Sequence, residues 1–374
     1  MSAAEKARIL AIDVGAGTTD VLLTQPGEPL ENAVKLVVPS RTRVVAAEID
    51  EATARGRAVA FDGPTMGGGA CAAAMKRHVA AGLPFLATPE AALTFADDLE
   101  RVRADGVTVV PEIEIIPRLG ALSQSSVVIR SGDLGLATFA QALTLLGVDA
   151  SCVDAVAIAA QDHGFSPSRS NRVVRFALWE AAIAARRHLN ELFYAPAEIP
   201  ADLTRLQAVA RQAQSLAHGM PVLVADTGPA ALYGALPNNI DNAVLVNIGN
   251  GHTFCVVALE RRFTGVFEHH TSCLTRNRLE EYLRRFLKGR LTTEEVLADG
   301  GHGAMLDSGA VASVAELPIL VTGPRRELLR GTTLAAEFAA PHGDMMLTGC
   351  FGLRRAVLDR FGAQLPPSER PSHQ

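Results

Sequence analysis

The sequence predicts an α/β protein with two similar halves, each a mixed sheet flanked by helices. Three observations predict this class. Alanine, glycine, valine and leucine dominate and aromatic residues are only 5% of the chain, which is typical of buried sheets covered by helices. Apolar segments of strand length alternate with segments of helical periodicity. A strand, a glycine-rich turn and a second strand occur twice, at 9–23 and 243–259, which indicates an internal duplication.

Composition limits the function classes. The 374 residues suggest two or three domains, and 48% hydrophobic with 20% charged residues indicates a globular chain. A net charge of −5 at pH 7 does not favour a nucleic acid or an anionic membrane as partner. We expect no membrane span, because no run reaches about 18 apolar residues. No apolar segment precedes the first strand, so we expect no signal peptide and a cytoplasmic protein.

The five cysteines also favour a reducing compartment. Their number is odd and their spacing is wide, which does not suit a disulfide framework. No CxxC or CxxxCxxC motif occurs, so neither a zinc ribbon nor a radical-type iron–sulfur site is expected. The cysteines stand at positions 71, 152, 255, 273 and 350.

The first half of the chain alternates between apolar segments of strand length and segments of helical periodicity. After the hairpin at 9–23 we expect strands at 34–38, 43–49 and 57–61, helices at 70–81 and 88–104, a β-rich segment at 107–116, a helix at 134–146, an apolar strand at 153–160 and a helical region at 171–215.

The second half is more regular. We expect a strand at 221–225, a helix at 230–236, strands at 243–247 and 253–260 around a turn at 248–252, helices at 274–288 and 293–299, a loop at 300–303, a strand at 318–322, a helix at 345–360 and a disordered tail from 366.

The first glycine turn suits an anion-binding site. It reads Asp13-Val-Gly-Ala-Gly-Thr-Thr-Asp20. Gly15 and Gly17 allow φ > 0 and a close approach of the main chain to a phosphate. Asp13 can hold a hydrated Mg²⁺, and the hydroxyl groups of Thr18 and Thr19 can donate to phosphate oxygens. The alternative is an ordinary Gly-Thr hairpin.

Five segments, in order, resemble the actin-like ATPase superfamily of actin, DnaK-type chaperones and sugar kinases. They are the first phosphate loop at 13–20, a connecting helix at 226–234, a second phosphate loop at 244–253, an adenosine loop at 319–325 and a second connecting helix at 345–353. The resemblance implies a duplicated ribonuclease-H-like fold that holds Mg²⁺-ATP between two lobes. Lobe I would comprise 8–236 with 345–362 and lobe II 237–344, and 363–374 would be a disordered tail.

The same resemblance implies roles for individual residues. Asp13 and Asn247 would hold the metal, and Asp226 would act as a base or orient the attacking water. Asp226 also suits a helix N-cap, and Asp20 suits stabilisation of the turn. The nucleotide would contact Gly15, Gly17, Thr18, Thr19, Gly249, Asn250, Gly251, His252, Thr253 and Gly323.

Asn247 departs from the superfamily pattern, which has an aspartate there. A neutral oxygen weakens Mg²⁺ binding, so ATP turnover is expected to be slow. We expect an ATP hydrolase or phosphotransferase, and two alternatives stay open. Residues 161–164, Gln-Asp-His-Gly, resemble the acceptor-site segment of carbohydrate kinases, in which Asp162 and His163 could do acid–base work. Alternatively, ATP drives lobe closure that a protein partner detects.

More closely, the chain resembles a prokaryotic family labelled "putative pyruvate formate-lyase activating enzyme". Activation of that kind needs three cysteine thiolates around an iron–sulfur cluster, and the cysteine spacing here does not supply them. The histidines at 269, 270 and 302 are expected to be surface residues, with metal binding or a catalytic or acceptor-site role as the alternatives. The adjacent side chains of His269 and His270 point to opposite faces of a strand, so the two do not easily share one metal.

Overall fold

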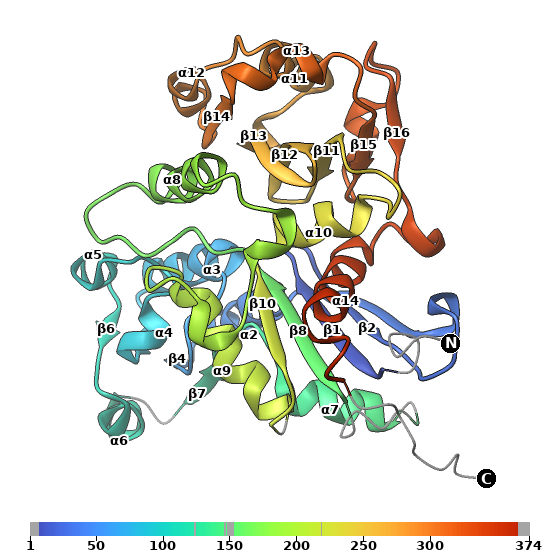
Figure 1. Cartoon of the computed structure of the whole chain (residues 1–374). Helices are drawn as coiled ribbons and strands as arrows, with labels where there is room; N and C mark the ends of the chain where they lie inside the picture. The colour runs from blue at the N-terminus through green and yellow to red at the C-terminus, as the bar shows by residue number, and fades with distance from the viewer. Residues whose placement is uncertain (1–6, 123–124, 146, 148–152, 218, 366–374) are drawn as a thin grey trace.

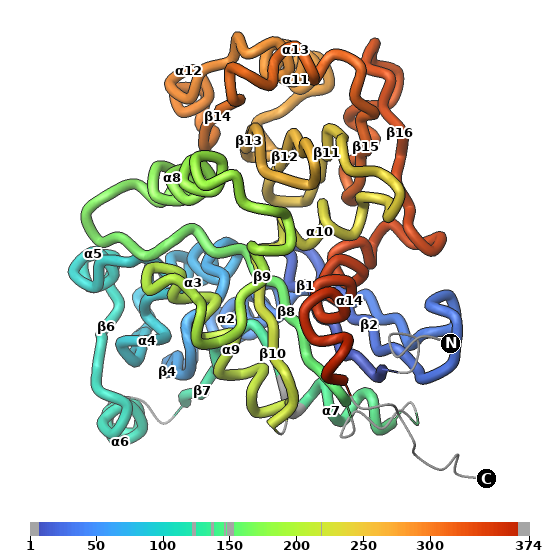
Figure 2. The backbone as a smooth tube through the Cα atoms, in the orientation of Figure 1, coloured from blue at the N-terminus to red at the C-terminus, as the bar shows by residue number. Residues whose placement is uncertain are grey.

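The computed structural model describes residues 7–122, 125–145, 147, 153–217 and 219–365. Two lobes, each built on a six-stranded sheet, lie one above the other, and a smaller unit lies beside the lower lobe (Figure 1). The backbone returns from the upper lobe through the last helix, which lies against the first strand (Figure 2).

The lobe I sheet has the order β3-β2-β1-β8-β10-β9. β1 pairs with β2 antiparallel and with β8 parallel. β8 is buried along its whole length and β1 at every residue except the half-buried Asp13, as expected of strands covered on both faces. The strands are β1 Ile9–Val14, β2 Thr18–Leu23, β3 Val34–Pro39, β8 Ala155–Ala160, β9 Phe193–Tyr194 and β10 Val222–Ala225.

The lobe II sheet repeats this plan in the order β14-β13-β12-β11-β15-β16. β11 pairs with β12 antiparallel and with β15 parallel, as β1 does with β2 and β8. The repeat confirms the duplication and the two-lobed α/β class. The strands are β11 Ala243–Ile248, β12 His252–Leu259, β13 Arg262–His270, β14 Gly303–Leu306, β15 Ile319–Thr322 and β16 Ala336–Phe338.

A third, parallel sheet of order β6-β5-β4-β7 forms the smaller unit, which the sequence analysis did not separate from lobe I. Its own core includes the packed rings of Phe61, Phe85 and Phe95. The elements are α2 Arg41–Ala54, β4 Ala58–Asp62, α3 Gly69–Ala80, β5 Phe85–Ala87, α4 Pro89–Ala92, α5 Leu99–Ala104, β6 Thr108–Val109, α6 Glu112–Leu122 and β7 Ser126–Arg130.

Three expectations in this region were wrong. Residues 43–49, expected as a strand, lie in α2, because Val45, Ile49 and Ala52 recur at helical spacing and are all buried. The β-rich segment at 107–116 is a strand only at β6, and α6 begins at Glu112. The single helix expected at 88–104 is two short helices, α4 and α5, because Asp98 caps a new helix.

The other helices are α7 Leu136–Leu145, α8 Asn171–Ala184, α9 Thr204–Ala217, α10 Thr227–Ala235, α11 Arg276–Leu287, α12 Thr293–Ala298, α13 Val311–Val314 and α14 Thr348–Phe361. Of these, α13 was not expected, α8 and α9 divide the helical region expected at 171–215, and the rest lie close to their expected positions. Short 3₁₀ turns occupy Leu30–Asn32, Leu189–Leu192, Pro196–Glu198, Thr271–Cys273, Ser308–Ala310, Arg326–Leu329 and Pro341–Gly343.

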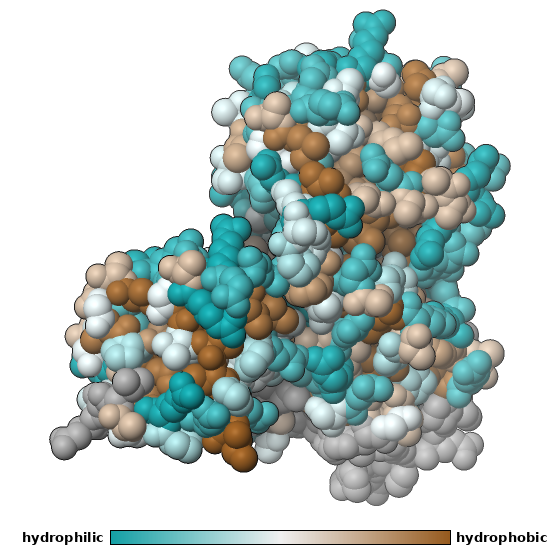
Figure 3. All heavy atoms as spheres, turned by 90° about the vertical axis from the view of Figure 1, so that its left-hand side faces the viewer, coloured by the Kyte–Doolittle hydropathy of each residue, from teal (hydrophilic) through white to brown (hydrophobic). Residues whose placement is uncertain are grey.

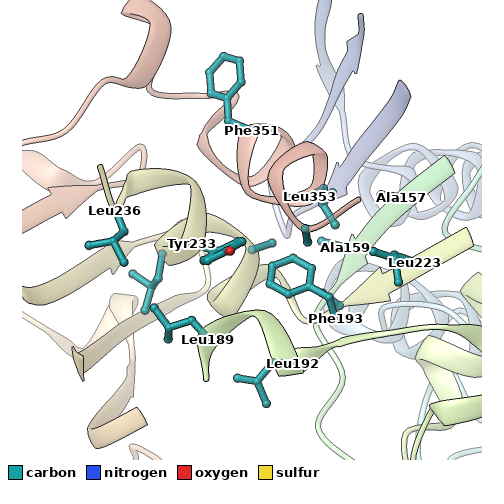
Figure 4. Packing of buried hydrophobic residues seen from close by; sticks show 14 of the residues in the cluster. Ala157, Ala159, Leu189, Leu192, Phe193, Leu223, Tyr233, Leu236, Phe351 and Leu353 are labelled. Carbon is teal, nitrogen blue, oxygen red and sulfur yellow. The ribbon is translucent and has the colours of Figure 1, made fainter. Parts of the chain in front are cut away.

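The main core lies where α10 and α14 cross between the lobes. Phe193, Tyr233 and Leu353 pack together there (Figure 4). The helices cross closely because both carry glycine: a Cβ on Gly234 would lie 1.9 Å from the Thr348 carbonyl oxygen, and one on Gly352 would lie 2.0 Å from that of Ala230. The crossing joins the two sheets directly.

The outer surface is chemically mixed, and the chain is still packed against the core near its last described residue. On the face in Figure 3, hydrophobic residues are interspersed with hydrophilic ones, and a step separates the upper lobe from the lower part of the molecule. Leu365 is buried in the main core, so the expected disordered tail does not begin at 363. Residues 366–374 lie outside the described residues.

Candidate functional site

The two glycine turns face each other across the junction of the lobes. The sequences Asp13-Val-Gly-Ala-Gly-Thr18 and Asn247-Ile-Gly-Asn-Gly-His252 occupy the same register of their hairpins. Each turn is closed by the same 2.9 Å bond, from the Gly15 amide to the Thr18 carbonyl and from the Gly249 amide to that of His252. The duplication therefore extends to the turns that were predicted to bind phosphate.

The glycines allow the two turns to approach each other closely, and they are not needed for a left-handed backbone conformation. Neither Gly15 nor Gly17 has a positive φ, contrary to the sequence expectation. A Cβ on Gly17 would instead lie 2.4 Å from the side-chain amide nitrogen of Asn250, and one on Gly251 would lie 3.4 Å from the Cβ of Ala16. The two turns are thus in contact, and larger side chains at position 17 would push them apart.

A cavity of about 90 Å³ lies between the turns. Most predicted nucleotide- and metal-binding residues line it: Asp13, Gly15, Gly17, Thr18, Asn247, Gly249, Asn250, Gly251, His252 and Gly323. Gly323 needs its glycine, because its φ is +98° and a Cβ would lie 2.6 Å from the Asn247 side-chain oxygen. Thr19 and Thr253 do not line it, and the buried Thr253 hydroxyl lies 3.1 Å from that of Thr271.

Two carboxyl groups, Asp13 and Asp20, lie at one end of this cavity. Burial, with the charges of Asp20 and Asp226 adding, holds the pKa of Asp13 well above its ordinary value. Burial also raises the pKa of Asp20 to about 7. One oxygen of each group, Oδ1, is buried without a hydrogen-bond partner. Such a pair favours a proton or a cation at this end of the cavity.

The hydrogen bonds of Asp226 differ from those expected of a catalytic base. It caps α10 by accepting from the Gly228 amide at 3.0 Å, and it accepts from the Asp162 amide at 3.0 Å. The Arg175 guanidinium donates to both of its oxygens, at 2.7 and 3.1 Å. Although burial raises the pKa of Asp226, Arg175 and these amides outweigh it and hold that pKa below the ordinary value. The contacts favour the N-cap interpretation over the base.

Arg175 is the functional-site residue that sequence reasoning missed. It is 1% exposed, and besides Asp226 it binds both carboxylate oxygens of Glu268, at 2.7 and 2.9 Å. Trp179 donates to Glu268 as well, at 2.9 Å. α8 thereby ties the cap of α10 to strand β13 of lobe II. The available signal was an arginine in an otherwise apolar stretch of helix, Val173 to Trp179, where a buried charge needs partners.

The segment after β8 lies beside the second glycine turn. Gln161 Nε2 lies 2.7 Å from His252 Nδ1 and so joins the two lobes. Asp162 accepts from the amides of Gly164 and Leu206, both at 2.9 Å, which makes it a loop-stabilising residue in this arrangement. His163 faces a second cavity of about 440 Å³, which Gln161 and His252 also line. The acid–base role predicted for Asp162 and His163 stays a prediction.

The structure confirms that His269 and His270 point to opposite faces of β13. His269, like His302, is buried and not at the surface as expected. It lies between Phe267 and Tyr282, with Nε2 3.4 Å from an Asp299 oxygen. His270 instead lies against His252 and His302 on the cleft side, at ring-centroid distances of 4.6 and 4.9 Å.

The chain is similar to a protein-family model and to a solved structure. The family model described as "Putative pyruvate format-lyase activating enzyme (DUF1786)" matches residues 66–328. The chain is also similar to the crystal structure of ethanolamine utilization protein EutJ from Carboxydothermus hydrogenoformans, at 11% identity and a TM-score of 0.30, over 92% of this chain and 88% of that one. The curated proteins give no match. Over the described residues, every helix is too short or too polar to cross a bilayer.

Proposed function

The chain belongs to the DUF1786 family, and from that premise we propose that it binds Mg²⁺-ATP between its lobes and acts as an ATP hydrolase or phosphotransferase. One observation carries the proposal: two glycine turns of equivalent register face each other across a cavity. Backbone amides from two sides can neutralise and orient a phosphate chain, which is most of what phosphoryl transfer requires.

The end of the cavity that carries Asp13 and Asp20 suits the binding of Mg²⁺. Asp13 carries a buried oxygen without a partner, and Asn247 on the opposite hairpin lines the same cavity. A carboxylate and an amide oxygen are hard ligands of the kind that Mg²⁺ accepts, directly or through water. When bound, Mg²⁺ would neutralise charge on the phosphates. Thr18, which also lines the cavity, would orient a phosphate oxygen.

The arrangement supports slow turnover. A general base needs a free lone pair and a pKa near the working pH, whereas Asp226 accepts four hydrogen bonds and has a lowered pKa. Asn247 also brings less negative charge to the metal than an aspartate would. Slow hydrolysis would suit a nucleotide-driven switch that reports lobe closure to a partner, since several contacts, such as Gln161 to His252, cross between the lobes.

A second candidate function, phosphoryl transfer to a small molecule, has one observation in its favour. The 440 Å³ cavity adjoins the nucleotide cavity, and Gln161, His252 and Thr227 line both. An acceptor there would lie next to the second glycine turn. We expect His163→Ala to lower transfer, if transfer occurs, while nucleotide affinity stays unchanged.

The activity in the family description is not part of the proposal. An iron–sulfur cluster needs cysteine thiolates that converge. The four cysteines among the described residues lie on separate elements: Cys71 on α3, Cys255 on β12, Cys273 in a 3₁₀ turn and Cys350 on α14. Cys152 lies outside the described residues. If anaerobically purified protein contained acid-labile sulfide, the activating-enzyme activity of the family description would again be a candidate.

The test is calorimetric titration with Mg²⁺ and a non-hydrolysable ATP analogue. We expect wild type to bind and Asp13→Asn, which keeps the side-chain shape but loses the charge, to bind at least about tenfold more weakly, since charge-assisted contacts are worth about 1.5–3 kcal/mol. Asp50→Asn is the matched control, because Asp50 pairs with Arg77 on the surface. Equal affinity in wild type and Asp13→Asn would refute the metal assignment, and no binding by wild type would refute the proposal.

A further inference from the structure

Four histidine side chains converge where lobe I meets lobe II, beside the glycine turns. His163 follows β8 in lobe I, and His252, His270 and His302 belong to lobe II. The rings of His163 and His302 are stacked at 5.8 Å, and His252 lies 5.4 Å from His163 and 4.9 Å from His302. Ligand nitrogens of His163, His252 and His302 all lie within 4.8 Å of one another.

The backbone holds these positions firmly. His252 and His270 are direct cross-strand partners of β12 and β13. The His302 amide donates to the Glu268 carbonyl at 3.0 Å, which fixes the residue immediately before β14. His163 lies between Asp162, whose carboxylate is fixed by two amides, and Gly164 at φ +76°. Side chains on paired strands and a capped loop are pre-organised for binding.

The cluster leaves ring nitrogens unsatisfied. His302 is fully buried, and neither of its ring nitrogens has a hydrogen-bond partner, while Nε2 of His252 also lacks one. Buried polar atoms are almost always paired, so three such atoms in one cluster indicate a missing partner. Because ligand nitrogens of three of these histidines lie within 4.8 Å of one another, a single ligand could contact several of them at once.

Protonation of the clustered histidines is unfavourable. Burial lowers the pKa of His163 to about 3. Burial, with the charge of Arg175 adding, also lowers the pKa values of His252 and His302. Neutral imidazoles each present one lone pair, which is the form that binds metals. Arg175 itself is paired with the carboxylates of Asp226 and Glu268.

We propose that His163, His252 and His302 together bind one divalent transition-metal ion of the zinc type, which joins the two lobes beside the nucleotide cavity. Three imidazoles without a carboxylate suit Zn²⁺ or a similar borderline ion and not Mg²⁺ or Ca²⁺. Zn–N bonds of about 2.0–2.1 Å place ligand nitrogens roughly 3.4 Å apart in a tetrahedron, so small side-chain rotations complete the site.

A supporting shell is already present. Gln161 lies 2.7 Å from Nδ1 of His252, and with its amide oxygen turned toward that nitrogen it would accept Nδ1–H and leave Nε2 free for the metal. Arg205 donates to the Gln161 carbonyl and binds Asp133. His163, His252 and His270 line the 440 Å³ cavity, so His270, water or a ligand could supply a fourth ligand from that side.

The test uses full-length protein without a histidine tag. Metal-stripped protein is titrated with Zn²⁺ against a chromophoric chelator, and Co²⁺ loading is followed by visible absorption. We expect one tightly bound Zn²⁺ per chain in wild type. Gln161→Ala should weaken binding about tenfold, the effect expected of an outer-shell partner, and His163→Ala and His302→Ala should weaken it further and change the Co²⁺ spectrum.

Two controls keep the result interpretable. His342→Ala removes an exposed histidine that lies beside Glu31 and is not part of the cluster, and it should bind like wild type. His163 is only partly buried and stands in a loop, so its variant tests the site even if His302→Ala fails to fold. Asp13→Asn should bind Zn²⁺ normally, which separates this site from the nucleotide proposal. Absence of tight binding in wild type, or unchanged affinity in His163→Ala, would overturn the inference.

Discussion

Asp20 places a carboxyl group among buried residues at the end of the cavity between the glycine turns, and its raised pKa predicts a pH-dependent stability. Burial raises its pKa to about 7, far above the unfolded value of about 3.9. Between these two values the unfolded state is ionised while the folded state keeps its proton. Folding therefore binds a proton in this window, and stability is lost as pH rises from about 4 toward 7.

We predict that Asp20→Asn reduces this loss. In Mg²⁺-free buffer the melting temperature of wild type should fall as pH rises from 5 to 8, and that of Asp20→Asn should fall less. Asp13, whose pKa is raised mainly by burial and in part by the charge of Asp20, contributes the same sign in both proteins, and its contribution is smaller in the variant because the Asp20 charge is gone. Melting curves by scanning calorimetry at each pH measure the difference. Parallel pH profiles would contradict the assigned pKa.

At the scale of elements, the α10–α14 crossing shows how glycine sets the distance between helices. A Cβ on Gly352 would lie 2.0 Å from the Ala230 carbonyl oxygen, a backbone atom that cannot move alone. We predict that Gly352→Ala forces the helices apart and lowers stability by several kcal/mol, on the order of other severe overpacking changes. Chemical denaturation measures the loss.

Gly120→Ala provides the matched control for this crossing. Gly120 lies in helix α6, and a Cβ there would meet nothing within 4 Å. The same substitution should therefore stabilise the protein by up to about 1 kcal/mol through helix propensity. Similar effects of Gly352→Ala and Gly120→Ala would show that the crossing tolerates a wider separation.

Elements with strong local signals could be predicted from the sequence, and those that depend on packing could not. The β1–β2 and β11–β12 hairpins carry apolar strands and glycine turns, and both form as expected. Segment 43–49 contains apolar residues that fit either period, and the third sheet selects the helix through Ile49 and its neighbours.

The candidate site likewise contains residues that local sequence signals predict and residues that only the packing brings together. The turn glycines were predicted from their spacing. The histidine cluster was not, because His163, His252 and His302 come from three distant segments with no local motif. Arg175 was missed for the same reason, since its partners Asp226 and Glu268 lie 51 and 93 residues away in the chain.

At the scale of the whole molecule, the lobes are closed on each other. The cavity between the glycine turns is about 90 Å³, whereas pockets for ligands of drug size have roughly 300–1,000 Å³. A nucleoside triphosphate therefore fits only if the lobes move apart at the turns, and hinge motion of this kind is common in two-lobed ligand-binding proteins. The α10–α14 crossing, which joins the lobes, is the natural place for the hinge.

A disulfide between the turns tests this motion. A Cβ on Gly251 would lie 3.4 Å from the Cβ of Ala16, close to the roughly 3.5–4.5 Å that a disulfide spans. Neither this distance nor the backbone at Gly251 requires a strained conformation. We predict that the oxidised double variant Ala16→Cys/Gly251→Cys loses binding of the ATP analogue, because the lobes can no longer separate, and that a reductant restores it.

The single variants Ala16→Cys and Gly251→Cys, treated with the same oxidant, are the controls. They carry the same new side chains and the exposed native Cys273, but cannot close the bridge between lobes, so their affinity should not depend on oxidation. Titration calorimetry before and after reduction gives the comparison. If the oxidised double variant binds the analogue as well as its reduced form, nucleotide entry does not require separation of the turns, and the ligand of this cavity must be smaller than a nucleoside triphosphate.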